Sequence, residues 1–187
     1  SRMTTHGSQL FEKNNQPVFS EKKKIYCVHN GIIANYEQLW KKFIKQRSQE
    51  QKLPDLDTQV VVDILEKFFE KYSVSEAFFR LYQEIEGVAN FAVMIPGEKT
   101  LVLSSNTGSL YWFEDSKKNI WFASEKIFLR ELVQKMFSTE TGFSIFRVKP
   151  TSAVVINESS IQKVSLFKKP ALTKKTKQVA TKTIYKN

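Results

Sequence analysis

Three short segments of the sequence gather residue types that could bind a small polar substrate. They are residues 1–7 (SRMTTHG), 29–36 (HNGIIANY) and 57–59 (DTQ). An arginine can hold a carboxylate through two hydrogen bonds, and an aspartate can pair with an ammonium group. An asparagine side chain and a glycine N–H are donors that could stabilise an oxyanion. Each segment alone also has a simpler interpretation, because Asn-Gly is a common turn sequence and an aspartate often caps a helix.

The first half of the chain predicts elements that would position these segments. Residues 24–30 (KIYCVHN) are apolar and β-prone, and they predict a strand that runs into a turn at Asn30-Gly31. Apolar residues at helical spacing predict three helices, at residues 35–47, 58–72 and 75–85. Asp57 precedes the second helix and is predicted to cap it.

The second half of the chain predicts short strands separated by Gly, Pro, Asn and Asp turns. Those strands are expected at residues 88–95, 101–105, 110–113, 120–123, 144–148, 152–156 and 161–164. A fourth helix is expected at residues 127–137. Helices gathered in one half and antiparallel strands in the other predict an α+β layered fold.

Charge divides the chain into two parts. The net charge is +10, and the last 22 residues contain seven lysines and no acidic residue. Removing those lysines leaves 22 basic against 19 acidic residues, a net charge of +3 for residues 1–165. We therefore predict a folded domain over residues 1–165 and a basic, disordered tail over residues 166–187. The tail is either a solubilising extension or a contact for nucleic acid or an acidic partner.

Composition bounds the remaining possibilities. Hydrophobic residues make up 41% of the 187 residues, enough for one domain with a substantial core. No apolar run approaches the ~20 residues that cross a bilayer, so we expect no membrane partner. The single cysteine, Cys27, excludes an internal disulfide and favours the cytoplasm. Two histidines and one cysteine, far apart in the sequence, indicate no metal site.

The three polar segments, in this order and with these gaps, resemble class II (N-terminal-nucleophile) glutamine amidotransferases. The resemblance is closest to the glucosamine-6-phosphate synthase branch, where the first segment reads Arg-Trp-Ala-Thr-His-Gly. Residues 14–17 (NNQP) are also similar to the amidophosphoribosyltransferase branch. Residues 86–92 and 123–125 resemble the family's Gly-Ala-Tyr strand and its Ala-Ser-Glu turn. Together the matches span about residues 1–156.

The resemblance implies a four-layer αββα sandwich that binds L-glutamine at one edge and needs no cofactor. Attack on an amide builds negative charge on its oxygen, which needs hydrogen-bond donors. The resemblance implies that the Asn30 side chain and the Gly31 backbone N–H are these donors and form the oxyanion hole. The resemblance also implies that Arg2 binds the α-carboxylate of glutamine and that Asp57 binds its α-ammonium group.

Two residues of the first segment, Thr5 and His6, match a loop that in the family folds over the bound amino acid. His6 could equally be a loop residue without a catalytic part. His29 is expected to be structural, because alternation along a strand would point it away from Asn30.

Several features depart from the family pattern. Met3 replaces a tryptophan, and residues 106–109 (NTGS) replace an Arg-x-Gly-x-Pro stretch. In the family a cysteine at the processed N-terminus attacks the amide, with its own amine as the base. Ser1 aligns inside the first motif, and Cys27 is interpreted as a small buried hydrophobe. The predicted sandwich therefore lacks its first strands and its nucleophile. These could lie on a separate N-terminal segment, be absent from this sequence, or have been lost.

Two functions remain open from the sequence. The chain could be the larger, C-terminal part of an amidotransferase domain that releases ammonia and glutamate, with an ammonia-acceptor domain or subunit as partner. It could instead be a non-catalytic scaffold or binding module descended from the same fold, with the basic tail as its contact site. The retained set of Arg2, Asn30, Gly31 and Asp57 favours the first function, and the missing nucleophile favours the second.

Overall fold

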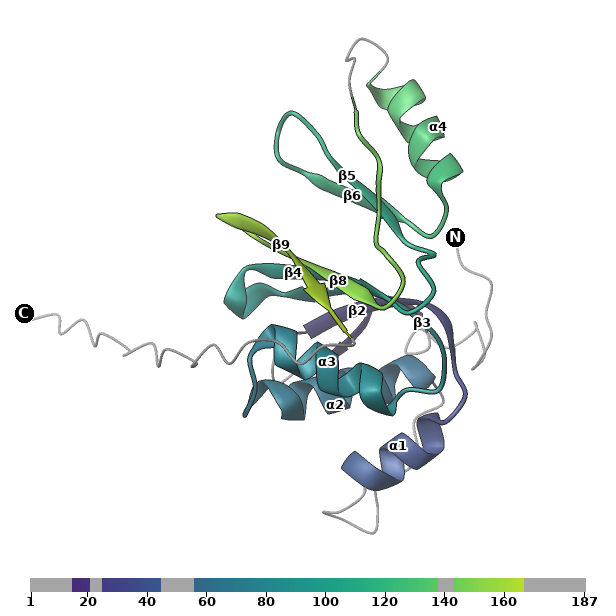
Figure 1. Cartoon of the computed structure of the whole chain (residues 1–187), viewed down its shortest axis with the longest axis vertical. Coiled ribbons are helices and arrows are strands. Elements are labelled where there is room, and N and C mark those ends of the chain that lie inside the picture. The colour runs from purple at the N-terminus through teal and green to yellow at the C-terminus, as the bar shows by residue number, and fades with distance from the viewer. Residues whose placement is uncertain (1–14, 21–24, 45–55, 138–142, 167–187) are drawn as a thin grey trace, which may run out of the picture.

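The computed structural model describes residues 15–20, 25–44, 56–137 and 143–166, which form a mixed α+β fold (Figure 1). Six antiparallel strands form the larger sheet, in the order β1-β2-β3-β4-β8-β9. Their bounds are β1 Val18–Ser20, β2 Ile25–Ile33, β3 Gly87–Ile95, β4 Thr100–Ser105, β8 Ser152–Asn157 and β9 Ser160–Ser165. The smaller sheet has the order β6-β5-β7, with β5 Tyr111–Glu114, β6 Ile120–Ala123 and β7 Phe146–Arg147.

Helices lie on the outer side of each sheet. Their bounds are α1 Tyr36–Phe43, α2 Asp57–Phe69, α3 Val74–Glu84 and α4 Lys126–Met136. Helices α2 and α3 cover one face of the larger sheet, and the smaller sheet lies over the other face (Figure 1). Helix α4 packs on the far side of the smaller sheet, against β5 and β6 (Figure 1). None of the helices in the described ranges is long and apolar enough to cross a membrane.

Two hydrophobic cores hold these layers together. The larger core lies between the six-stranded sheet and helices α1 to α3, and side chains from β2 such as Ile25, Cys27 and Ile33 are fully buried in it. A smaller core between the two sheets includes Leu103 and Trp112. Since burying one large apolar side chain contributes about 1.5–3 kcal/mol, the larger core supplies most of the stabilisation.

Most of the elements predicted from the sequence are confirmed, with bounds shifted by no more than three residues where they are described. Strand β1 was not predicted, because it is only three residues long and follows directly on a proline. Helix α1 is described as far as Phe43, and the rest of the helix predicted at residues 35–47 falls largely outside the described residues. The predicted tail begins at Leu166, which is buried in the larger core, and residues 167–187 are outside the described ranges.

The turn predicted at Asn30-Gly31 is wrong. Strand β2 continues to Ile33, and Asn30 and Gly31 pair with Asn90 and Ala89 of β3. The chain turns at Asn35 instead, where the side-chain amide donates to Glu84 O at 2.8 Å and accepts from the Glu86 N–H at 3.0 Å. Pairing with β3 outweighs the local turn preference of Asn-Gly, and an asparagine five residues later makes the turn.

The helix cap predicted at Asp57 is also wrong by one position. Helix α2 begins at Asp57, and the capping position belongs to Leu56, which makes no side-chain capping bond. Asp57 is instead the first helical residue, where its negative charge still interacts favourably with the positive end of the helix dipole.

Candidate functional site

The carboxylate of Asp57 joins the start of α2 to the end of β2. Its Oδ2 atom accepts a hydrogen bond from the Ile33 N–H at 2.9 Å, and its Oδ1 atom accepts from the Thr58 N–H at 2.7 Å. The Thr58 hydroxyl donates to the same Oδ1 atom at 3.2 Å. Asp57 is only 2% exposed. A carboxylate offers about four acceptor positions, and the His29 ring lies beside Oδ2, with its Nδ1 atom 3.7 Å away.

Asp57 is held in its ionised form. Burial alone would raise its pKa, but the nearby His29 imidazole and the N–H groups of Ile33 and Thr58 outweigh burial and lower the pKa to about 2. The His29 Nδ1 atom lies 3.7 Å from Asp57 Oδ2, which is an ion-pair distance and too long for a hydrogen bond. Asp57 therefore carries a full negative charge at neutral pH.

His29, which the sequence predicted to be structural, is buried beside Asp57. Its ring packs 4.7 Å from the Phe91 ring, with Nε2 3.1 Å from the Val88 carbonyl oxygen and Nδ1 3.2 Å from the Thr58 hydroxyl. Alternation along β2 correctly places His29 on the opposite face from Asn30. That face, however, is where α2 brings Asp57, and sequence spacing carries no signal of this contact.

Gly31 occupies a position that excludes every other residue. Its φ angle is +149°, and a Cβ atom there would lie 1.9 Å from the Val88 carbonyl oxygen and 2.9 Å from His29 Nε2. Only glycine fits such a close backbone approach with a positive φ. The His29 ring therefore lies against both Gly31 and Asp57, which places the two predicted site residues around one imidazole.

The Asn30 side chain is exposed and lies on the opposite face of β2 from His29. Its backbone carbonyl accepts a hydrogen bond from the Asn90 side chain at 2.8 Å. The preceding peptide is held by Gln16, whose side-chain amide accepts from the His29 N–H at 2.8 Å and donates to the His29 carbonyl at 2.9 Å. Gln16 therefore extends the β1–β2 pairing with a side chain, to a residue two positions beyond Cys27, and it fixes the strand just before Asn30.

The structure thus places three of the six predicted site residues. It brings Asp57 and Gly31 to the end of β2, and it puts the Asn30 side chain on the other face of the same strand. Arg2, Thr5 and His6 lie outside the described residues, so the predicted clamp for the α-carboxylate stays a prediction.

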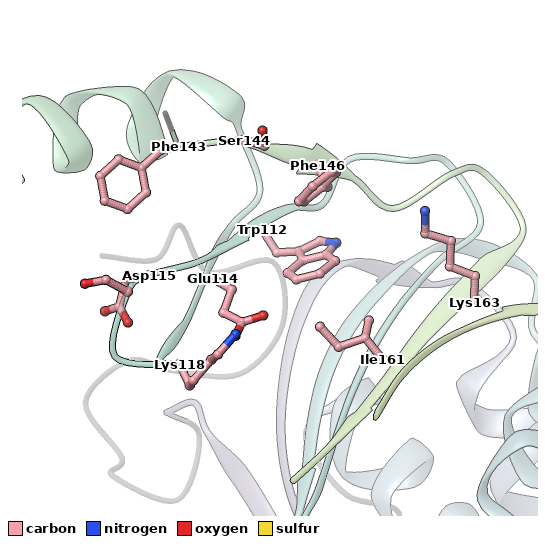
Figure 2. Close-up of a pocket in the computed structure, with 10 residues that line it drawn as sticks. Trp112, Glu114, Asp115, Lys118, Phe143, Ser144, Phe146, Ile161 and Lys163 are labelled. Carbon is pink, nitrogen blue, oxygen red and sulfur yellow. The ribbon is translucent and has the colours of Figure 1, made fainter. Parts of the chain in front are cut away.

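Among the cavities in the described part of the chain, two lie between the sheets, and neither of these is lined by Asn30, Gly31 or Asp57. The larger, about 670 Å³, lies between the smaller sheet and the edge strand β9 (Figure 2). In it Trp112 and Phe146 pack with ring centroids 5.2 Å apart, across from Ile161 and Lys163 (Figure 2). The smaller, about 510 Å³, is lined by exposed apolar residues of β2 and β6, including Val28 and Phe122.

Cys27 is buried within the larger core. It is 0% exposed, and burial followed by the charge of Asp57 raises the pKa of its thiol far above the usual range. A thiol of this kind neither ionises nor meets a substrate at neutral pH. Within the described ranges, no group of three His, Cys, Asp or Glu side chains is arranged to hold a metal ion.

Comparisons with known proteins connect this geometry to one family. The profile of the family described as "Glutamine amidotransferase domain" matches residues 2–131. The glutamine–fructose-6-phosphate aminotransferase (isomerizing) of Listeria innocua is 30% identical over 134 residues, which cover 70% of this chain and 21% of that protein. The enzyme of the same name from Halalkalibacterium halodurans is 38% identical over 80 residues, 43% of this chain and 13% of that protein. The chain therefore spans about a fifth of the length of these relatives, or less.

Solved structures share the fold at lower sequence identity. The glutamine phosphoribosylpyrophosphate amidotransferase of B. subtilis, complexed with ADP and GMP, matches with a TM-score of 0.62 and 16% identity, over 84% of this chain and 33% of that chain. A glutamine aminotransferase class-II domain protein from Silicibacter pomeroyi matches with a TM-score of 0.52 and 15% identity, over 83% of this chain and 72% of that one. With a family profile covering more than half of the sequence, the chain belongs to the class II glutamine amidotransferase domain family.

Proposed function

We propose that this chain is the glutamine-binding part of an amidotransferase domain that hydrolyses L-glutamine to glutamate and ammonia in the cytoplasm. The observation that carries the proposal is the ionised Asp57 carboxylate, fixed at the Ile33 N–H two residues beyond Gly31. A carboxylate that stays ionised at neutral pH is suited to the α-ammonium group of an amino acid. Membership of the family supports glutamine as that amino acid.

The other groups complete the reaction in this proposal. Arg2 holds the α-carboxylate, with Thr5 and His6 in the loop over the substrate. The Asn30 side chain and the Gly31 N–H stabilise the oxyanion that forms when a nucleophile attacks the side-chain amide. Cys27 is not that nucleophile, because its buried thiol is held in the neutral form. The nucleophile comes from polypeptide outside these 187 residues, and the released ammonia passes to an acceptor domain or subunit.

The same proposal extends to the architecture, which we infer to be a four-layer αββα sandwich without its first strands. On the face of β2 that is turned away from the helices, Tyr26, Val28 and Ile32 are apolar and between 37% and 44% exposed. Among the described strands, β6 forms an edge of the smaller sheet. An exposed apolar face beside a strand edge supports added strands from the nucleophile-bearing segment.

Isothermal titration with L-glutamine tests the proposal on the full-length product of the gene. Binding in the millimolar range or tighter is expected, with loss of detectable binding in Asp57→Ala. Asp63→Ala, on the same helix and half-buried, is the matched control and should bind normally. Circular dichroism confirms that both variants are folded. Absence of binding at millimolar glutamine, or normal binding by folded Asp57→Ala, would defeat the proposal and leave the scaffold hypothesis.

A further inference from the structure

The Asn30 carbonyl and the Gly31 N–H belong to the same peptide group. A trans peptide is planar, so its C=O and N–H point in opposite directions across the strand. The Asn90 side chain donates from Nδ2 to the Asn30 carbonyl oxygen at 2.8 Å, from the β3 side of β2. The Gly31 N–H is thereby directed away from β3, and its direction is set by a bond made at the other end of the peptide.

The orientation of the Asn90 amide is itself determined by its neighbours. Its Oδ1 atom lies 2.5 Å from the Ser105 hydroxyl and 2.9 Å from the Thr107 hydroxyl. The Ser105 oxygen already accepts the Gly108 N–H at 2.6 Å, so its own hydrogen is free to point at Asn90. Two hydroxyl donors on one side require the carbonyl of the Asn90 amide there, and the NH₂ group must face Asn30. Asn90 is 2% exposed, so water does not compete for these bonds.

We propose that Asn90 is a positioning residue for the oxyanion hole: it aims the Gly31 N–H and strengthens it as a donor. A hydrogen bond to a peptide carbonyl draws electrons toward the oxygen and makes the N–H of the same peptide a stronger donor, by about 10–30% per bond. Donors that are fixed in advance stabilise developing charge without reorganising during the reaction. The catalytic part of this inference rests on the proposed function of Asn30 and Gly31.

The loop of residues 106–109 contributes to the hydrogen bonds around Asn90. In place of an arginine-containing stretch it supplies Thr107, which bonds Asn90, and Gly108, which bonds Ser105. Arg147 of β7 holds the loop from outside, donating from Nε to the Gly108 carbonyl at 2.7 Å. The smaller sheet is thereby connected through this loop to the peptide that carries the predicted oxyanion donor.

The chain offers a matched control in Asn106. Its side-chain Nδ2 donates to the Gly87 carbonyl at 2.8 Å, and its Oδ1 accepts from the Ala89 N–H at 2.9 Å. Asn106 therefore makes the same kind of bond, from a side-chain amide to a strand carbonyl, but its partners lie on β3 and it does not contact the Asn30 carbonyl of β2. Asn90→Asp and Asn106→Asp each replace an NH₂ donor by a carboxylate oxygen, and only the first changes the Asn30–Gly31 peptide.

The test combines kinetics and NMR on the full-length product of the gene. With ¹⁵N-glycine labelling, this sequence contributes six backbone signals. In Asn90→Asp the Gly31 signal should move, whereas the Gly97 signal should not. Glutaminase kcat should fall about 10- to 100-fold, which is no more than the fall caused by removing an oxyanion-hole donor completely. The KM for glutamine should change less than about twofold. Asn106→Asp should leave the Gly31 signal and kcat unchanged.

The outcomes separate this inference from the proposed function. A folded wild type without glutaminase activity defeats the proposed function, and the catalytic part of the inference with it. An active wild type with unchanged kcat or an unmoved Gly31 signal in Asn90→Asp defeats only the inference, as would equal losses in both variants. If Asn90→Asp does not fold, Ser105→Ala decides the question, because it keeps the amide and removes one group that orients it. A smaller loss of kcat at unchanged KM is then expected, and no loss overturns the inference.

Discussion

The Oδ2 atom of Asp57 accepts a hydrogen bond from the Ile33 N–H at 2.9 Å, across a sequence separation of 24 residues. This bond fixes the first turn of α2 against the last residue of β2, so the helix layer and the sheet keep a defined register at this point. The same carboxylate is the one we assign to the glutamine ammonium group. Stability and substrate binding therefore depend on one ionisation, which makes pH a sensitive probe.

Acid should remove the contribution of Asp57 to stability. The pKa of Asp57 falls from 3.8 to about 2 on folding, so the unfolded chain binds the proton more tightly. The contribution is fully present above pH ~5 and is lost as pH falls through ~2; the shift corresponds to about 2 kcal/mol. Urea unfolding of wild type and Asp57→Asn should show a free-energy difference at pH 7 that shrinks by about this amount at pH 2.5.

Asp63 on the same helix is a control, because its pKa is shifted in the opposite direction from that of Asp57. Burial raises its pKa, although the hydrogen bond from Gln59 acts the other way. A raised folded pKa favours the protonated form, so stability from this group is present at low pH and lost as pH rises. Asp63→Asn should therefore gain stability relative to wild type as pH rises from 3 to 7. A difference that does not vary with pH in either variant would contradict the assigned pKa shifts.

Substituting Gly31 should be among the most damaging single changes in the chain. In Gly31→Ala the new Cβ atom would lie 1.9 Å from the Val88 carbonyl oxygen, at a φ of +149°. Separating β2 from β3 to relieve the clash would disturb the larger core, so a loss of more than about 3 kcal/mol in urea unfolding is expected. Gly97→Ala is the matched control, because its Cβ would meet nothing within 4 Å. It should change stability by less than about 1 kcal/mol.

The sequence predicted the elements better than it predicted the site. Periodicity found α2, α3 and the strands of both sheets except β1, because each buries one face and alternation or helical spacing follows from that. It could not find the contact between His29 and Asp57, since this depends on where α2 lies over β2. The turn at Asn30-Gly31 was predicted from local preference and was overridden by pairing with β3. The Asn90 network was likewise invisible, because two neighbouring strands and a loop supply its members.

Cys27 should be unreactive until the protein unfolds. Its thiol is fully buried between β2 and the helices, and burial raises its pKa. Ellman's reagent should therefore label less than a tenth of the Cys27 thiol in native protein over minutes, and one thiol per 187-residue chain in concentrated urea. The assay is best followed by mass spectrometry of the Cys27 peptide, so that cysteines elsewhere in the gene product do not interfere. Rapid labelling of native Cys27 would reopen it as a candidate nucleophile.

The last prediction concerns Asp115, which organises the hairpin between β5 and β6. Its carboxylate accepts hydrogen bonds from the Trp121 indole N–H and the Asn119 amide, each at 2.9 Å, and from the Lys117 and Asn119 backbone N–H groups. The bond from Trp121, followed by those from Asn119 and Lys117, outweighs the opposing effect of burial and lowers the pKa of Asp115 to about 2. Asp115→Ala leaves these donors without their shared acceptor, so we expect a clear fall in Tm at pH 7.

The adjacent carboxylate supplies the comparison for Asp115. Glu114 pairs with Lys118 at 2.7 Å, but the lysine side chain is 83% exposed, and such surface pairs contribute little. Glu114→Ala should therefore lower Tm much less than Asp115→Ala. The pKa of Asp115 is lower in the folded protein than in the unfolded chain. The difference in Tm between the two variants should therefore be largest above pH ~5 and should shrink as pH falls toward 2. Thermal unfolding at pH 7, 4 and 2.5 measures it; equal Tm losses at pH 7 would show that Asp115 does not organise the hairpin.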